Sequence, residues 1–126
     1  MTERLVLCAV SYADGVPTSW RIVDRTSGED VGSIGFFGRN DAAGGVLVGY
    51  EVANVWRGRG LATEALSAVL SYVADTRIAA TVLAETEADH VASRRVMEKA
   101  GMAVREIDGG RVVYAFDCTR AVASAP

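Results

Sequence analysis

The stretch NVWRGRGLATEAL, residues 54–66, places a tryptophan and two arginines among glycines and then continues as a helix-forming segment. From Leu61 to Val73 apolar residues recur at helical spacing, and polar residues occupy the opposite side of the pattern. The preceding segment GVLVGYEVANV, residues 45–55, is typical of a strand. A helix that follows a glycine-containing loop offers free N–H groups and the positive end of its dipole to an anion. The stretch therefore predicts a phosphate-binding junction between a strand and a helix.

Two other phosphate-binding motifs fit this stretch poorly. A Walker loop needs a Gly-Lys-Ser/Thr ending, which is absent. A dinucleotide fingerprint that starts at Gly58 and Gly60 needs glycine or alanine where Thr63 stands. A tight turn with solvated arginines is the remaining structural alternative.

Length and composition predict one domain over residues 1–118, followed by a loose tail, TRAVASAP, at 119–126. The net charge of −3 argues against a nucleic-acid partner, so an anionic ligand must be bound by a local cluster of basic residues. The apolar run Leu5–Val10 is shorter than a signal-peptide core or a membrane span. We therefore expect a cytoplasmic protein with no membrane partner.

Both cysteines, Cys8 and Cys118, fall in strand-like segments near opposite ends of the chain. They show no CxxC or histidine spacing that would suggest a metal site. We expect two reduced core thiols and no bound metal.

The remaining segments alternate strands with turns before and after the helix. Asp89 is a candidate N-cap for a second helix that runs to Gly101. Hairpin turns are predicted at Ser27–Gly28 and at residues 108–110. The other predicted strands are RLVLCAVSY (4–12), TSWRIVDRT (18–26), EDVGSIGFFG (29–38), AATVLAET (79–86), AVREI (103–107) and RVVYAFDC (111–118).

The junction resembles a known family. Arg57, Gly60 and Ala62 match the R-x-x-G-x-A pyrophosphate loop of the GNAT superfamily of acyl-CoA-dependent N-acetyltransferases, and GYEVANVWRGRGLATEAL is similar to the ribosomal-protein-alanine N-acetyltransferase branch. HVASRRVMEKAGM, residues 90–102, is similar to that branch's N-x-x-S-x-R-V-L-E-K-x-G-F segment, and TERLVL resembles its first strand. The resemblance covers about residues 3–117.

The resemblance implies an α/β (α+β) fold with a mixed, mostly antiparallel twisted sheet and two main helices. Its fourth and fifth strands, about residues 45–53 and 80–86, splay apart and hold the pantetheine of acetyl-CoA, the expected cosubstrate. The backbone N–H of Val52 is expected to stabilise the oxyanion. The expected cofactor contacts in the loop and the first helical turn are Arg57, Gly58, Arg59, Gly60, Ala62 and Thr63.

The expected reaction is direct attack of an amine on the thioester in a ternary complex. An α-amine costs only about 1 kcal/mol to deprotonate near pH 7, whereas a lysine costs about 4 to 5 kcal/mol. A weak base therefore suffices for a protein or peptide α-amine. Glu51 is the first candidate and Glu85 the second, and for each the alternative is a solvated strand glutamate.

The second helix supplies further candidates. Ser93 matches the serine proposed in this branch to act on the leaving thiolate, although a helix-surface serine is the alternative. His90 replaces the family asparagine, and it either keeps a cofactor contact, acts as acid or base, or only begins the helix. The tyrosine that many relatives carry at the position of Met97 is absent. A mainly solvated helix face is expected for Arg94, Arg95 and Lys99, and the alternative is that one of them reaches a CoA phosphate.

One departure from the family keeps a second function open. Relatives place two helices between the first and second strands, where this chain has only YADGVPTSW, residues 12–20. A transferase to a primary amine is one reading, and a non-catalytic acyl-CoA-binding module is the other. Without the two helices, we expect one face of the first strands to expose apolar residues such as Val6 or Val10, Trp20, Ile22 or Ile34. We therefore expect a homodimer whose interface contains residues of the first three strands or their loops.

Overall fold

The computed structural model describes residues 4–40 and 45–118, so the predicted tail at 119–126 lies outside the described residues. In this part of the chain seven strands form one sheet in the order β1-β2-β3-β4-β5-β7-β6. The strands are β1 (Leu5–Ala13), β2 (Val16–Asp24), β3 (Asp30–Asn40), β4 (Gly45–Val52), β5 (Thr81–Glu87), β6 (Ala103–Asp108) and β7 (Arg111–Asp117). The helices are α1 (Leu61–Thr76) and α2 (Val91–Lys99), with a 3-10 turn, η1 (Asn54–Trp56), before α1.

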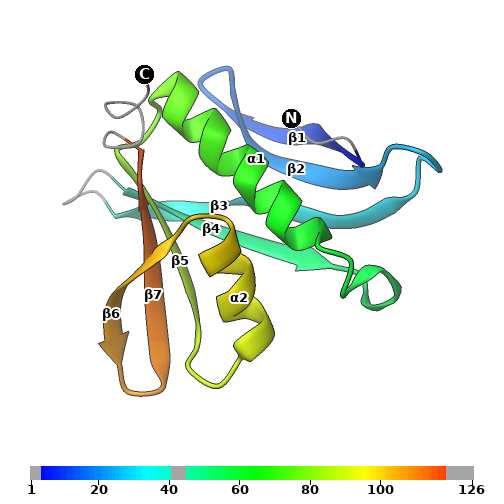
Figure 1. Cartoon of the computed structure of the whole chain (residues 1–126). Coiled ribbons are helices and arrows are strands. Elements are labelled where there is room, and N and C mark those ends of the chain that lie inside the picture. Colours follow the sequence, from blue (N-terminus) through cyan, green and yellow to red (C-terminus); the bar gives the residue numbers. More distant parts are fainter. Residues whose placement is uncertain (1–3, 41–44, 119–126) are drawn as a thin grey trace, which may run out of the picture.

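The sheet divides between β4 and β5. This is the one parallel pair among the described strands, and it spans only Gly45–Leu47 against Thr81–Leu83. Beyond it β5 stays paired with β7 as far as Glu87, while β4 stays paired with β3 as far as Val52. Figure 1 shows β1–β4 and the β5-β7-β6 group running in clearly different directions. The predicted fold class, including the splayed central strands, is confirmed.

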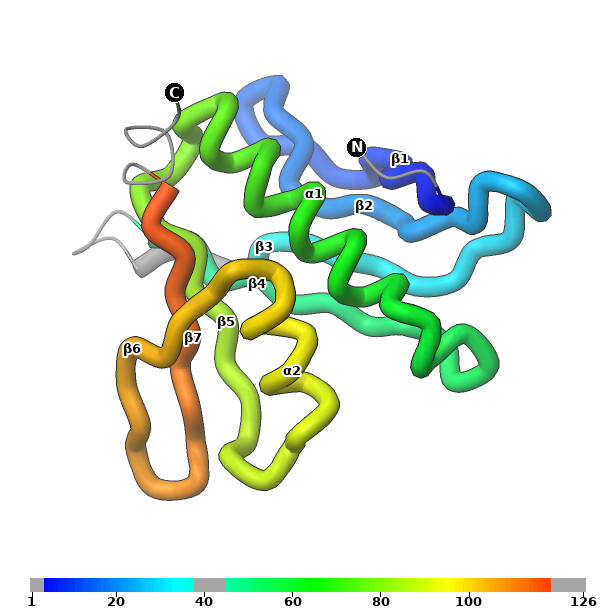
Figure 2. Tube along the Cα trace, in the orientation of Figure 1, coloured from blue at the N-terminus to red at the C-terminus, as the bar shows by residue number. Residues whose placement is uncertain are grey.

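Both helices cover the same face of the sheet, as the tube in Figure 2 shows. The predicted stripe of α1 is confirmed, because Leu66, Val69 and Val73 are buried. They belong to one core cluster with residues of β2, such as Ile22 at 0% exposure. Trp20 packs edge-on against Phe36 and Tyr72, with ring centroids 5.8 and 5.4 Å away. This core fixes α1 across the first four strands.

The opposite face has no helix over it among the described residues, because a two-residue turn joins β1 to β2. Asp14 and Gly15 both adopt the left-handed conformation, with φ of 52° and 80°, as a tight hairpin turn requires. Trp20, Ile22 and Ile34 are buried on the α1 side, so the expectation that they are exposed is wrong. Val10, which was also expected to be exposed, is 53% exposed, and the other large apolar side chains exposed in this half of the described sheet are Tyr12 (62%) and Phe37 (75%).

The two cysteines differ in environment. Both are free, but Cys8 is exposed, so the prediction of two core thiols holds only for Cys118. Burial raises the pKa of the Cys118 thiol to about 11. Among the described residues, no cluster of three or more histidine, cysteine, aspartate or glutamate side chains could hold a metal ion. No described helix is long and apolar enough to cross a membrane.

Candidate active site

The loop before α1 leaves the start of that helix open. Gly58 and Gly60 have φ of 78° and 79°, a conformation that favours glycine. Gly60 is the N-cap of α1, and no side-chain hydrogen bond caps the helix. The Glu64 N–H bonds to the Gly60 carbonyl, which leaves the N–H groups of the three preceding residues without an intrahelical acceptor. Free N–H groups at the positive end of a helix dipole are suited to binding an anion.

A groove of about 720 Å³ runs from this helix start between β4 and α2. It brings together most of the residues predicted from sequence: Glu51, Val52, Arg57, Gly58, Gly60, Ala62, Thr63, His90 and Ser93. Residues that were not predicted also line it: Tyr50, Trp56, Leu61, Val91, Ala92, Arg95, Val96 and Lys99. Arg59 and Glu85 are the two predicted residues that do not line it.

The two loop arginines have different partners. Arg57 lines the groove and donates through Nε to the Val52 carbonyl at 2.9 Å, which ties the loop to the end of β4. Arg59 lies over the Trp56 ring, 4.8 Å from its centroid, and donates to the Val55 carbonyl at 3.2 Å. Arg59 therefore braces the loop from outside the groove.

The opposite wall of the groove is α2, and His90 begins it. The Ser93 N–H donates to His90 Nδ1 at 3.1 Å, so His90 is the N-cap and the predicted capping by Asp89 is wrong. This geometry supports the helix-start role of His90, which also lines the groove. The imidazole accepts the same N–H that a capping asparagine side chain accepts.

The basic residues of α2 do not all face solvent. Arg95 and Lys99 line the groove, where they add positive charge opposite the start of α1. Arg94 is half-buried and donates to the Tyr114 hydroxyl at 3.0 Å and to the Ala88 carbonyl at 3.1 Å. The expectation of a solvated side chain is therefore wrong for Arg94.

Among the lining residues that were not predicted, Tyr50 places a hydroxyl beside Ser93. Its hydroxyl lies 3.3 Å from Ser93 Oγ and donates to the Ser93 carbonyl at 3.5 Å. Burial raises the pKa of the Tyr50 phenol, and its hydrogen bond with Ser93 opposes that rise. Tyr50 is therefore a protonated hydroxyl at neutral pH, held against the first turn of α2.

Adjacent residues of β4 face different directions. The Ala53 N–H donates to the Val31 carbonyl at 2.8 Å, so strand alternation turns the N–H of Val52 toward the side from which β5 has diverged. Glu51 is exposed and forms no hydrogen bond or ion pair with any residue that the structure describes. Two adjacent residues that line the groove thus supply an N–H donor and a carboxylate without a partner among the described residues.

Glu85, the second candidate base, lies elsewhere. It is an exposed residue of β5, and Arg111 on β7 donates to its carboxylate at 2.9 Å. The structure does not bring Glu85 to the groove lined by the other candidates.

Residues 2–103 match the sequence profile described as "Acetyltransferase (GNAT) domain". The chain belongs to the GNAT acetyltransferase family. Among curated proteins, this GNAT chain is similar to the uncharacterized N-acetyltransferase YjdG of Bacillus subtilis (strain 168), at 29% identity over 83 residues. The match covers 66% of this chain but spans only about half, 49%, of that relative.

Solved GNAT structures share the fold at low sequence identity. An acetyltransferase from Agrobacterium tumefaciens str. C58 matches with a TM-score of 0.73 at 20% identity, over 92% of each chain. The ribosomal-protein-S5-alanine acetyltransferase from Vibrio fischeri matches with 0.68 at 14% identity, over 80% of this chain and 61% of that one. The microcin C7 self-immunity acetyltransferase MccE, in complex with acetyl-CoA and AMP, matches with 0.66 at 17% identity, over 79% and 59%. The ribosomal-protein branch is thus one of several similar branches.

The cap at His90 is testable by stability measurements. His90→Ala removes the acceptor for the Ser93 N–H and should lower the free energy of unfolding by about 1 kcal/mol. His90→Asn keeps an acceptor at this position and should stay within a few tenths of a kcal/mol of the unchanged protein, roughly the spread among good caps. Urea unfolding followed by circular dichroism measures both. Equal losses for the two variants would contradict the capping role.

Proposed function

We propose that the protein is an N-acetyltransferase that moves the acetyl group of acetyl-CoA to a primary amine, most directly a protein or peptide α-amine. The observation that carries this proposal is the single groove that joins the uncapped start of α1 to Glu51, Tyr50 and Ser93. One end of the groove suits a pyrophosphate, and the other end holds groups for proton transfer. The expectation from the sequence that the amine attacks the thioester directly remains part of the proposal.

Donor binding follows from the charges of the groove. The pyrophosphate would lie on the N–H groups of the first turn of α1, beside Arg57, with Arg95 and Lys99 across the groove. The pantetheine would run along β4, where β5 has diverged and leaves strand N–H groups without a strand partner. In this pose the Val52 N–H is the donor for the developing oxyanion.

Two adjacent residues of β4, Glu51 and Tyr50, lie on opposite faces of the strand and can transfer protons in the reaction. Glu51 takes the proton of the attacking amine as the N–C bond forms and the C–S bond breaks. The Tyr50 hydroxyl, hydrogen-bonded to Ser93, gives its proton to the leaving sulfur and regains one from solvent or from Glu51. The net result is one amide, one free thiol and no change in protonation of the protein. Tyr50 thereby replaces the hydroxyl that the family places at Met97, a residue that is buried here.

The first prediction concerns donor binding. Gly60→Asp places a negative charge where the pyrophosphate would lie, so acetyl-CoA affinity should fall by at least tenfold in calorimetry. Gly28→Asp is the matched control, because Gly28 has a similar φ of 76° but lies in the β2–β3 turn. Equal affinities for the two variants would remove the loop from the proposed donor site.

The second prediction concerns catalysis. CoA released from acetyl-CoA with a panel of peptides and amines should be measured by chromatography, because a thiol reagent would also have access to the exposed Cys8 thiol. Tyr50→Phe should lower kcat by about tenfold to a hundredfold with acetyl-CoA affinity retained. Ser93→Ala should also lower kcat, and the double variant should lose less than the product of the two effects, because the hydroxyls act as a pair.

Tyr72→Phe is the control for this experiment. Tyr72 is a half-buried tyrosine of α1 whose pKa is also raised by burial, but it packs on Trp20 and does not line the groove. A kcat that falls equally in Tyr72→Phe would assign the effect to packing. Binding of acetyl-CoA without CoA release for any amine would instead establish the alternative, a non-catalytic acyl-CoA-binding module.

We also propose a cytoplasmic homodimer. Acetyl-CoA is an intracellular metabolite, and β1 is an edge strand that exposes Val10 and Tyr12. None of the described residues that line the groove belongs to β1, so a second copy on this edge need not cover the proposed acetyl-CoA site. Sedimentation over a wide concentration range should show a dimer that Tyr12→Lys dissociates. A monomer at every concentration would contradict the dimer.

A further inference from the structure

A second depression, of about 330 Å³, lies on the face of the sheet opposite α1. Its lining includes Tyr50 and Glu51, which also line the groove proposed for acetyl-CoA. The two hollows therefore share two lining residues of β4. A molecule in the second depression would reach the thioester from the face that the two-residue β1–β2 turn leaves without a helix.

The floor of this depression carries opposite charges at its two ends. Strand register aligns Arg21 on β2 with Ser33 on β3, and Ser33 with Glu51 on β4. Neighbouring strands lie about 4.8 Å apart, so the backbones of Arg21 and Glu51 are separated by about 10 Å. A cation and an anion thus flank a small serine in one row across the sheet.

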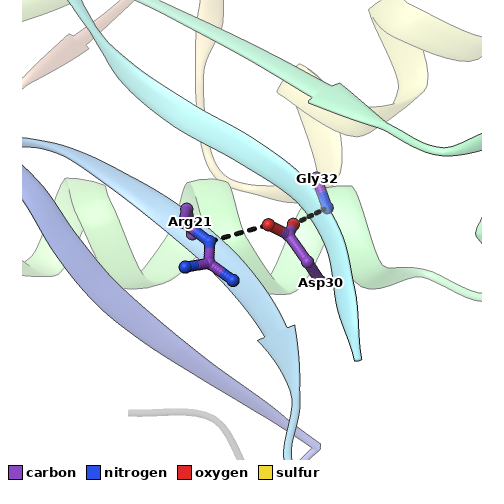
Figure 3. Close-up of polar contacts among 3 residues, drawn as sticks. All are labelled: Arg21, Asp30 and Gly32. Atoms are coloured by element: carbon purple, nitrogen blue, oxygen red, sulfur yellow. Dashed lines mark hydrogen bonds and ion pairs between the residues drawn. The ribbon is translucent and has the colours of Figure 1, made fainter. Parts of the chain in front are cut away.

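Arg21 is held with part of its guanidinium free. Its Nε donates to Asp30 Oδ2 at 2.7 Å, and Asp30 Oδ1 accepts the Gly32 N–H at 3.2 Å, as the dashed lines in Figure 3 show. Within residues 4–40 and 45–118 the Arg21 side chain makes no other hydrogen bond. The terminal nitrogens of Arg21 are therefore available to a carboxylate, in the geometry that guanidinium groups favour.

The rest of the lining is small or apolar. Ser19, Gly35 and Gly49 form the row next to Arg21, Ser33 and Glu51. Phe37, which is 75% exposed, lies over Gly49. Such a floor accepts an extended chain laid across the strands, with the Phe37 ring as an apolar side wall.

We propose, on the basis of the acetyltransferase function above, that this depression binds the N-terminus of an acidic peptide. The α-amine lies at Glu51, beside the thioester, and a carboxylate at the second or third residue pairs with Arg21. An extended peptide rises about 3.3 Å per residue, so an acidic side chain two residues from the amine spans the row. Arg21 is in this scheme a specificity residue for the acceptor.

The test compares two peptide amides, Ala-Glu-Glu-Ala and Ala-Arg-Arg-Ala, which carry one α-amine each and no other amine. The unchanged protein should acetylate the acidic peptide with a kcat/KM about fivefold higher, mainly through KM, as expected for an exposed ion pair. Arg21→Glu should invert the preference, and Arg21→Gln should bring the ratio close to one without placing a carboxylate beside Asp30. Arg105→Glu makes the same charge change on exposed β6 and should leave the ratio unchanged.

The outcomes separate this inference from the proposed function. Acetylation of both peptides at equal rates, or a ratio unaffected by either Arg21 variant, overturns the inference while the transferase stands. The same holds if small amines are acetylated and neither peptide is. If no amine yields CoA release, the transferase and the inference fail together.

Discussion

The separation of β4 from β5 is the constraint on which the rest of the structure depends. A parallel pair that ends after Leu47 leaves strand N–H groups without a strand partner, which is costly inside a sheet unless a ligand or water accepts them. α1 leaves β4 through η1 and crosses the first four strands, while α2 lies on the β5 side, as Figure 1 shows. Because α1 packs on the β1–β4 half and α2 on the β5 half (Figure 1), the groove lies between β4, the start of α1, and α2.

The polarity of the groove has a similarly simple origin. The glycine at the N-cap of α1 has no side chain that could accept the N–H groups of the next three residues, and these residues line or adjoin the groove. The start of α2 is capped, because His90 Nδ1 accepts the hydrogen bond of the Ser93 N–H. The Ser93 hydroxyl lies within hydrogen-bonding distance of the Tyr50 hydroxyl. One helix start is therefore open to an external anion, whereas the other is closed and organises side chains.

The sequence predicts best what depends on neighbouring residues. The stripe of α1, the hairpin turns and the loop at residues 57–62 are local patterns, and the resemblance to a family added the divergence of β4 and β5. The contact of Tyr50 with Ser93 joins residues 43 positions apart, so no local pattern indicates it, although alternation in GYEV favours the covered face for Tyr50.

Arg57 and Arg59 look alike in sequence, and only the fold of the loop turns one to the groove and the other onto Trp56. Glu85 does not line the groove, and its partner Arg111 lies 26 residues away in the sequence, so no local pattern indicates their ion pair.

The close packing of Phe37 on Gly49 has a consequence for chemistry. A Cβ at residue 49 would lie 1.8 Å from Phe37 Cε2, so the ring fits only over glycine and thereby fixes how β4 is aligned on β3. Side chains alternate along a strand, so a shift of one residue would exchange the faces of Tyr50 and Glu51. The hydroxyl would then lie among the row from Arg21 to Ser33, and the carboxylate would be buried beneath α2. The identity of the proton donor and of the proton acceptor is thus encoded in the alignment of two strands.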